Sequence, residues 1–184
     1  MEIAYISLAT TVAVAFVGYL ATYTNNLLLA RRRERLDLVS KQLNEFYGPL
    51  YLSTRASAIA YSAMTAKLGA TFRQGYPHEP TDGDTPAMRE WRLWVLEVLM
   101  PMNATQEKLI INSAHLIREH EVPDCLLQLI AHIAAWKAVI KKWDEGNIAE
   151  QFALIPYPAK VSEYAAEAFR SLKAEQLALI GKTT

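Results

Sequence analysis

Hydrophobic residues follow two different patterns along this chain. The first thirty residues are almost continuously apolar, and no charged side chain occurs from Ile3 to Ala30. As a helix, residues 3–23 alone would span about 30 Å, the thickness of a bilayer's hydrocarbon core. From Leu36 onward, apolar residues recur at three- and four-residue spacing, the pattern of helices that bury one face. The sequence therefore predicts one N-terminal transmembrane helix that continues into a helical bundle.

A secretory signal peptide is the main alternative for the apolar segment. Signal peptides start with positive charge, and their apolar stretch is shorter and ends at a cleavage site of small residues. Here the segment is long, and Glu2 is the only charged side chain before it. We therefore interpret residues 1–30 as a retained transmembrane anchor.

Four arginines follow the anchor directly, at Arg31, Arg32, Arg33 and Arg35. Basic residues stay on the cytoplasmic side of a membrane, so they predict an inner-membrane, single-pass protein with its N-terminus outside and its C-terminal part in the cytoplasm. The same side chains can contact anionic lipid headgroups. The lone Cys125 fits a reducing compartment and excludes a disulfide framework or a cysteine-based zinc site.

The overall charge argues against nucleic acid as a partner. The chain contains 19 Lys and Arg and 19 Asp and Glu, so its formal net charge is zero. Outside the arginine cluster, acidic residues slightly outnumber basic ones. Binding to a phosphate backbone needs many Lys or Arg on one face, so no nucleic-acid partner is expected.

A narrow apolar stripe marks residues 31–49 as a basic juxtamembrane stalk. Its members are Leu36, Val39, Leu43, Phe46 and Leu50, and the same spacing continues into the anchor through small residues such as Gly18. Small residues allow membrane helices to approach closely, and larger apolar residues pack helices in water. Two arrangements remain open: a homo-oligomer in which the stalk pairs with itself, or packing of the stripe against the same chain.

Glycine and proline divide the rest of the chain. Gly48 and Pro49 are predicted to form a hinge that ends the long helix and starts the next, because proline disrupts a helix interior but suits a first turn. Residues 50–184 are expected to form an all-α, antiparallel bundle of about five helices, at residues 50–68, 87–100, 104–119, 124–143 and 159–180. The Gly- and Pro-rich residues 69–86 are predicted to be a flexible loop. Pro101 is expected to kink or stop a helix, and Asn103 to cap the next one.

Motifs that would indicate common enzymes are missing from the sequence, which contains no P-loop, no dinucleotide-binding glycine pattern and no HExxH. The best polar group is formed by Asn112, His115 and His132, which an antiparallel helix pair would bring to similar heights. With Glu107 or Glu45, the two histidines could bind a metal. The alternative, a buried hydrogen-bonded cluster that fixes the register of the helices, is the one we favour, so no metal or other cofactor is assigned.

Three stretches carry a resemblance to other proteins. "FYGPLY" at residues 46–51 and "WVLEVLMPMN" at residues 94–103 are followed by "NSAHLI" at residues 112–117. Together they resemble a group of uncharacterised bacterial single-pass membrane proteins with an FYGPLY-like segment after a basic juxtamembrane linker. The resemblance implies a membrane anchor and an all-α C-terminal region, and it implies no activity.

Three functions remain open on the sequence. The first and favoured one is a membrane-anchored interaction or scaffold protein that binds membrane lipid and a protein partner. The second is a membrane effector of bacterial stress or phage defence that acts by oligomerisation. The third is a metal- or His-dependent enzyme that uses His115 and His132. The absence of enzyme motifs makes an enzymatic role the less favoured interpretation.

Overall fold

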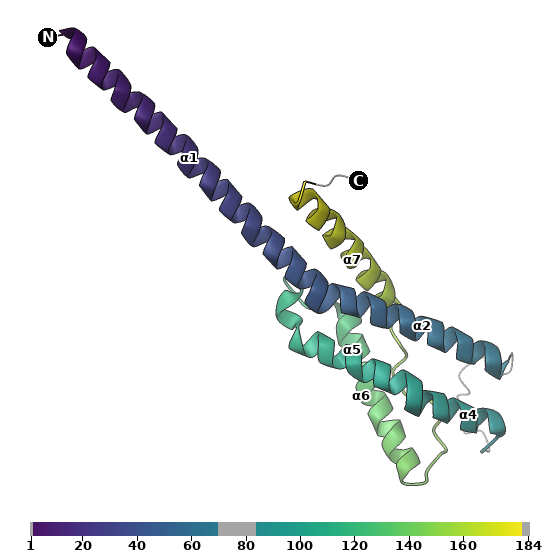
Figure 1. The fold of residues 1–184 in the computed structure, drawn as a ribbon. Helices are drawn as coiled ribbons and strands as arrows, with labels where there is room; N and C mark the ends of the chain where they lie inside the picture. Colours follow the sequence, from purple (N-terminus) through teal and green to yellow (C-terminus); the bar gives the residue numbers. More distant parts are fainter. Residues whose placement is uncertain (1, 70–83, 182–184) are drawn as a thin grey trace. The chain divides into compact units, whose positions relative to one another are not determined.

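The structure, a computed structural model, describes residues 2–69 and 84–181, with side chains from Ala13 onward (Figure 1). All regular elements in these residues are helical, which confirms the all-α prediction. The chain divides into two compact units: Met1–Ser40 with Glu175–Thr184, and Lys41–Ala174. We call them the N-terminal unit and the helical body. Residues 70–83 of the predicted loop lie outside the described residues.

The described elements run in the following order along the chain. They are α1 (Glu2–Gln42), the π-helical turn η1 (Leu43–Tyr47), α2 (Gly48–Leu68), α4 (Pro86–Trp94), the π-helical turn η2 (Val95–Leu99), α5 (Met100–Asn112), the 3₁₀ turn η3 (Ala114–Leu116), α6 (Asp124–Asp144) and α7 (Lys160–Leu179). Two predicted helix ends are confirmed by glycines in the left-handed region: Gly69, with φ of 84°, follows α2, and Gly181, with φ of 77°, follows α7.

The junction between α1 and α2 is a π-helical turn. The predicted boundary is present, because α2 begins at Gly48 with Pro49 in its first turn. The backbone nevertheless stays helical there, with φ of −65° and ψ of −56° at Gly48, whose N–H donates to the Leu43 carbonyl. Pro49 offers no N–H to the carbonyl of Glu45, and that carbonyl accepts the Ser113 hydroxyl at 3.3 Å instead. The wider turn thus accommodates the proline without a break.

A second proline is accommodated in the same way. The η2 turn precedes Met100 and Pro101, and the N–H of Met100 donates to the carbonyl of Val95. Of the two outcomes expected at Pro101, a kink or a stop, the stop is wrong, since α5 includes Pro101. The prediction that Asn103 caps the next helix is wrong as well, because Asn103 lies buried within α5. The helix predicted to reach Glu119 ends at Asn112.

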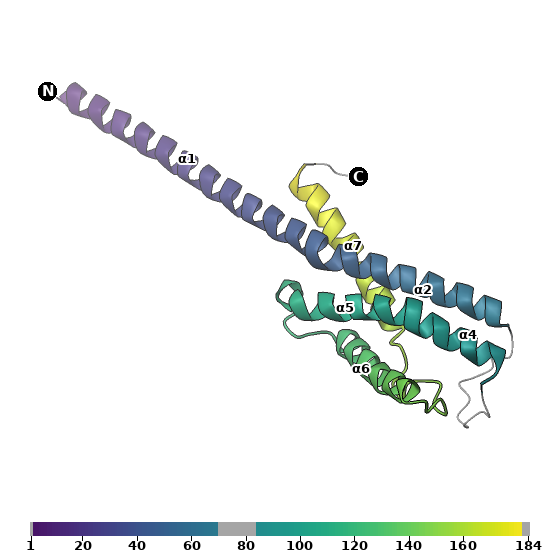
Figure 2. The ribbon, with the colours of Figure 1, turned by 60° about the horizontal axis from the view of Figure 1, so that its bottom comes forward.

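The core of the helical body gathers around the α1–α2 junction. Helix α2 packs against α4, η2 and α5, and α5 packs against α6 (Figure 2). The largest fully buried apolar side chains are Phe46, Tyr47, Leu50, Met64, Ile110, Leu126, Leu129, Ile133 and Leu172. In the stalk stripe, Leu43, Phe46 and Leu50 are therefore buried inside the body, and Val39 is buried as well. Of the two arrangements left open by the sequence, packing within the chain accounts for this half of the stripe.

Candidate functional site

Helix α1 exposes large apolar side chains on all of its faces in the N-terminal unit. Residues 13–30 are all exposed, and the large apolar ones are Val14, Phe16, Val17, Tyr19, Leu20, Tyr23, Leu27, Leu28 and Leu29. By length and composition, one helical stretch in the described residues, Ala13–Leu68, contains a window apolar enough to cross a membrane, and none of that window is buried. A signal sequence near an N-terminus meets the same criterion.

The arginine cluster after this segment contains two kinds of side chain. Arg32 donates from Nε to the carbonyl of Leu179 at 2.8 Å, and Arg35 forms an ion pair with Glu175 at 2.6 Å. Leu179 is the last residue of α7, where carbonyl groups lack partners in the helix and attract positive charge. Arg31 and Arg33 are exposed. The sequence predicted that all four arginines serve as a topology signal and contact lipid. It did not predict that two of them bind the end of α7.

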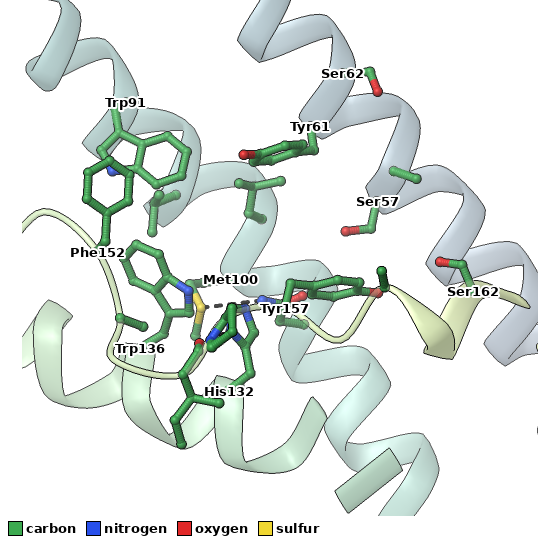
Figure 3. Close-up of a pocket in the computed structure, with 18 residues that line it drawn as sticks. Ser57, Tyr61, Ser62, Trp91, Met100, His132, Trp136, Phe152, Tyr157 and Ser162 are labelled. Carbon is green, nitrogen blue, oxygen red and sulfur yellow. Dashed lines mark hydrogen bonds between the residues drawn. The ribbon is translucent and has the colours of Figure 1, made fainter. Parts of the chain in front are cut away.

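The helical body encloses a cavity of about 430 Å³ (Figure 3). Its walls come from α2, α4, η2, α5 and α6, together with the irregular segment after α6 and the first turn of α7. The lining consists of Ser57, Ala58, Tyr61, Ser62, Trp91, Val95, Leu99, Met100, Asn103, His132, Trp136, Phe152, Ala153, Ile155, Pro156, Tyr157, Ala159 and Ser162. None of these residues is Asp, Glu, Lys or Arg. The cavity is therefore neutral and predominantly apolar and aromatic.

The depth of the cavity follows from the exposure of its lining. Val95 and Trp91 are 1% and 3% exposed, and Asn103 is 4% exposed, so they form its floor and inner wall. Tyr61 is 44% exposed, and Ala58 and Ser62 on the same helix are exposed too. The cavity therefore opens to solvent along α2. A volume of this size lies within the usual range of small-molecule sites, about 300–1,000 Å³.

His132 is the principal polar side chain of the cavity wall. Its Nδ1 lies 2.6 Å from the carbonyl of Ile155, which can only accept, so Nδ1 carries the proton. In the neutral ring, Nε2 is then an acceptor, and it makes no hydrogen bond to a residue that the structure describes. Burial lowers the pKa of His132, and the bond to Ile155 raises it by less. The imidazole is therefore neutral near pH 7.

The segment that joins α6 to α7 is held against the cavity by donors from the helices. Trp91 donates from its indole nitrogen to the carbonyl of Gln151 at 2.8 Å, and Trp143 donates to the carbonyl of Glu150 at 2.6 Å. His132 supplies a third such bond, to Ile155. These bonds satisfy carbonyls that regular secondary structure would otherwise occupy. They fix Phe152 and Tyr157 as walls of the cavity.

Tyr157 belongs to the same wall. Its hydroxyl oxygen is buried. Burial raises the pKa of Tyr157 to about 12, although the neighbouring Ser162 offsets part of this rise. The ring of Tyr157 meets that of His132 edge-on, with centroids 5.5 Å apart.

The polar cluster expected from the sequence is not assembled. Asn112, at the end of α5, and His115, in η3, are both exposed, whereas His132 is buried in the cavity wall. The reason is the early end of α5, because the turn that follows takes His115 off the helix face on which the prediction placed it. Within the described residues, no group of three or more His, Cys, Asp or Glu is arranged to hold a metal ion.

A different polar cluster, which the sequence did not reveal, surrounds Tyr47. The Tyr47 hydroxyl accepts the N–H of Arg118 at 2.9 Å and lies 3.2 Å from the Tyr164 hydroxyl. Tyr164 donates to Glu119 at 3.0 Å. Burial raises the pKa values of both tyrosines, so both remain protonated donors. This cluster joins the α1–α2 junction to α7 and to the connection between α5 and α6.

The residues of "FYGPLY" have structural roles in the helical body. Phe46 and Leu50 are fully buried, Gly48 and Pro49 form the π-helical junction, and Tyr51 stacks on Phe169 with ring centroids 5.0 Å apart. The motif therefore contributes to the core of the body, and none of its residues lines the cavity. Comparison with known proteins adds no family: no family model, curated protein or solved structure matches the chain.

Proposed function

We propose that this chain is a membrane-anchored helical interaction protein. In this proposal α1 spans the inner membrane, Arg31 and Arg33 face lipid headgroups on the cytoplasmic side, and the helical body recruits a protein partner in the cytoplasm. The observation that carries the proposal is the apolar surface of α1, which is exposed on every side from residue 13 to residue 30. Large apolar surfaces of this kind in water mark contact with lipid or protein.

Charge and length support the anchor over a soluble helix. A core helix of a soluble protein buries at least one face, whereas the window in α1 buries none of its residues. Arginines directly after an apolar stretch favour their retention on the cytoplasmic side. Arg32 and Arg35 bind the last turns of α7. They therefore hold the part of α1 that would emerge from the bilayer against the end of α7.

Membrane extraction with a matched pair of variants tests the anchor. Val17→Arg places a charge at the middle of the apolar segment, which disfavours insertion by about 2.5–3.5 kcal/mol. Leu52→Arg places the same charge on α2 at a site of similar exposure, 67% against 64% for Val17. The wild type and Leu52→Arg should remain in the membrane pellet after alkaline carbonate washing, and Val17→Arg should be released.

The N-terminus and the topology need separate measurements. An intact mass that includes residues 1–30 in the membrane fraction is expected for an anchor, and its loss would show a cleaved signal peptide. Lys141→Cys in a Cys125→Ser background places a thiol at an exposed position of the body. An impermeant maleimide should label it only after the cells are opened. Labelling in intact spheroplasts would show that the body lies outside the cytoplasm, the opposite of the proposed orientation.

The interaction role is tested by purifying the full chain in mild detergent and identifying what accompanies it by mass spectrometry. A partner that remains bound to the wild type and is lost when its contact surface on the body is mutated is the expected result. Recovery of the chain with lipid alone would contradict the recruitment of a protein. The proposal of an effector makes a different prediction, a loss of membrane potential on overexpression, and no feature of the described residues favours it.

A further inference from the structure

The cavity in the helical body has the composition of a ligand site, and it is independent of the membrane anchor. Its walls contain three aromatic rings placed at mutual angles: the centroid of Trp91 lies 5.9 Å from that of Trp136 and 5.3 Å from that of Phe152 (Figure 3). Tyr61 and Tyr157 add two more rings at the mouth and on the opposite wall. A flat ring entering along α2 would meet aromatic faces and edges, the contacts that aromatic pairs prefer.

Charge defines what the cavity excludes. Because none of its lining residues is Asp, Glu, Lys or Arg, a charged ligand would be buried without a counter-charge. Such burial is strongly unfavourable, whereas a neutral apolar ligand gains free energy in proportion to the area it removes from water. The occupant that fits is therefore neutral.

The polar groups define how such a ligand would be oriented. His132 Nε2 is an acceptor without a hydrogen bond from the described residues, and its protonation state is fixed from the other side by the Ile155 carbonyl. An N–H or O–H of a ligand would satisfy it. Few but fixed polar groups in an apolar cavity are the usual means of ligand orientation.

We propose that this cavity binds a neutral, planar aromatic molecule that carries one hydrogen-bond donor, such as an indole or a phenol, with the donor on His132 Nε2 and the ring against the cluster of Trp91, Trp136 and Phe152.

The test compares three probes on the full chain in detergent by isothermal titration, with micelles alone as the blank. Indole should bind with a dissociation constant below about 1 mM. The probe 1-methylindole, which keeps the ring and lacks the donor, should bind roughly fivefold to tenfold more weakly. The charged probe indole-3-acetate should not bind. Indole should also shift the ¹⁵N resonance of His132 Nε2 in labelled protein.

A matched pair of variants places the site. Ala58→Trp introduces a ring at the mouth of the cavity, and Ala56→Trp introduces the same ring two residues away, at an exposed position that does not line it. The first should weaken indole binding at least about fivefold and the second should leave it unchanged, with thermal midpoints confirming that both fold. Undetectable indole binding to the wild type, or equal binding to both variants, would overturn the site. Equal affinity for indole and 1-methylindole would overturn the assignment of His132.

Discussion

Replacing Gly48 with alanine should destabilise the helical body, although the same change stabilises an ordinary helix. Alanine is favoured over glycine inside helices by about 1 kcal/mol. At Gly48, however, an added Cβ would lie well inside 3.0 Å of the Leu43 carbonyl oxygen, a separation that Cβ atoms essentially never show. The carbonyl belongs to the backbone and the backbone also fixes the position of a Cβ, so no side-chain rotation relieves the overlap. Overpacking of this kind costs about 1–3 kcal/mol, and subtracting the alanine preference leaves a net destabilisation of up to about 2 kcal/mol.

Equilibrium unfolding in urea measures this difference directly. The chain's tryptophans, Trp91, Trp94, Trp136 and Trp143, all lie in the helical body, so their fluorescence reports its unfolding. Gly18→Ala is the matched control, because Gly18 is also helical and a Cβ there meets nothing within 4 Å. The control should leave the midpoint of the body unchanged. A stability equal to or above that of the wild type in Gly48→Ala would refute the argument from steric overlap.

Three further predictions follow from the described contacts. Tyr47→Phe should destabilise the body by about 1–3 kcal/mol in the same urea assay, because it removes the hydroxyl that accepts the Arg118 N–H, whereas Tyr51→Phe, which keeps its stack on Phe169, should be nearly neutral. Since burial lowers the pKa of His132 below its ordinary 6.5, the unfolded chain takes up the proton first. The stability from neutral His132 should therefore be complete above pH 6.5 and decline as pH falls below it, and the urea midpoint of His132→Gln should depend less on pH over this range than that of the wild type. Gly18→Cys in a Cys125→Ser background should give a crosslinked dimer in membranes if the exposed small-residue stripe of α1 pairs two chains, and a monomer on oxidation would exclude pairing at this face.

The sequence predicted the features that depend on local chemistry. Gly69 and Gly181 end helices because only glycine enters the left-handed region without strain, and the structure places both there. Apolar spacing located α6 and the burial of Leu126, Leu129 and Ile133 on one face. These features are decided by neighbours along the chain, so a single sequence contains the information.

The features that the sequence did not predict depend on distant segments. The cavity joins Ser57, Trp91, His132 and Phe152, which come from different elements, and no spacing along the chain relates them. The sequence identified His132 as a candidate, but with the wrong neighbours, because it predicted that the preceding helix continues to Glu119, whereas α5 ends at Asn112. Arg32 and Arg35 were assigned to lipid because the end of α7, which they bind, lies far away in the sequence.

A comparison of the two prolines explains why Pro101 does not stop its helix and how tightly the backbone at Gly48 is constrained. A π-helical turn precedes the residue before each proline. The N–H of that residue, Gly48 or Met100, donates to the carbonyl five residues earlier, one residue further back than in an α-helix. At the second turn the residue before proline is Met100, which carries a side chain with φ of −70° and ψ of −38°. A π-helical turn before proline therefore does not itself require glycine. Gly48 differs in its ψ of −56°, and relaxing it toward the value at Met100 would shift α2, and with it the buried Leu50 and the Tyr51–Phe169 stack. The stability of Gly48→Ala thus measures how firmly the core holds this joint, since only a yielding core would let alanine adopt the geometry of Met100.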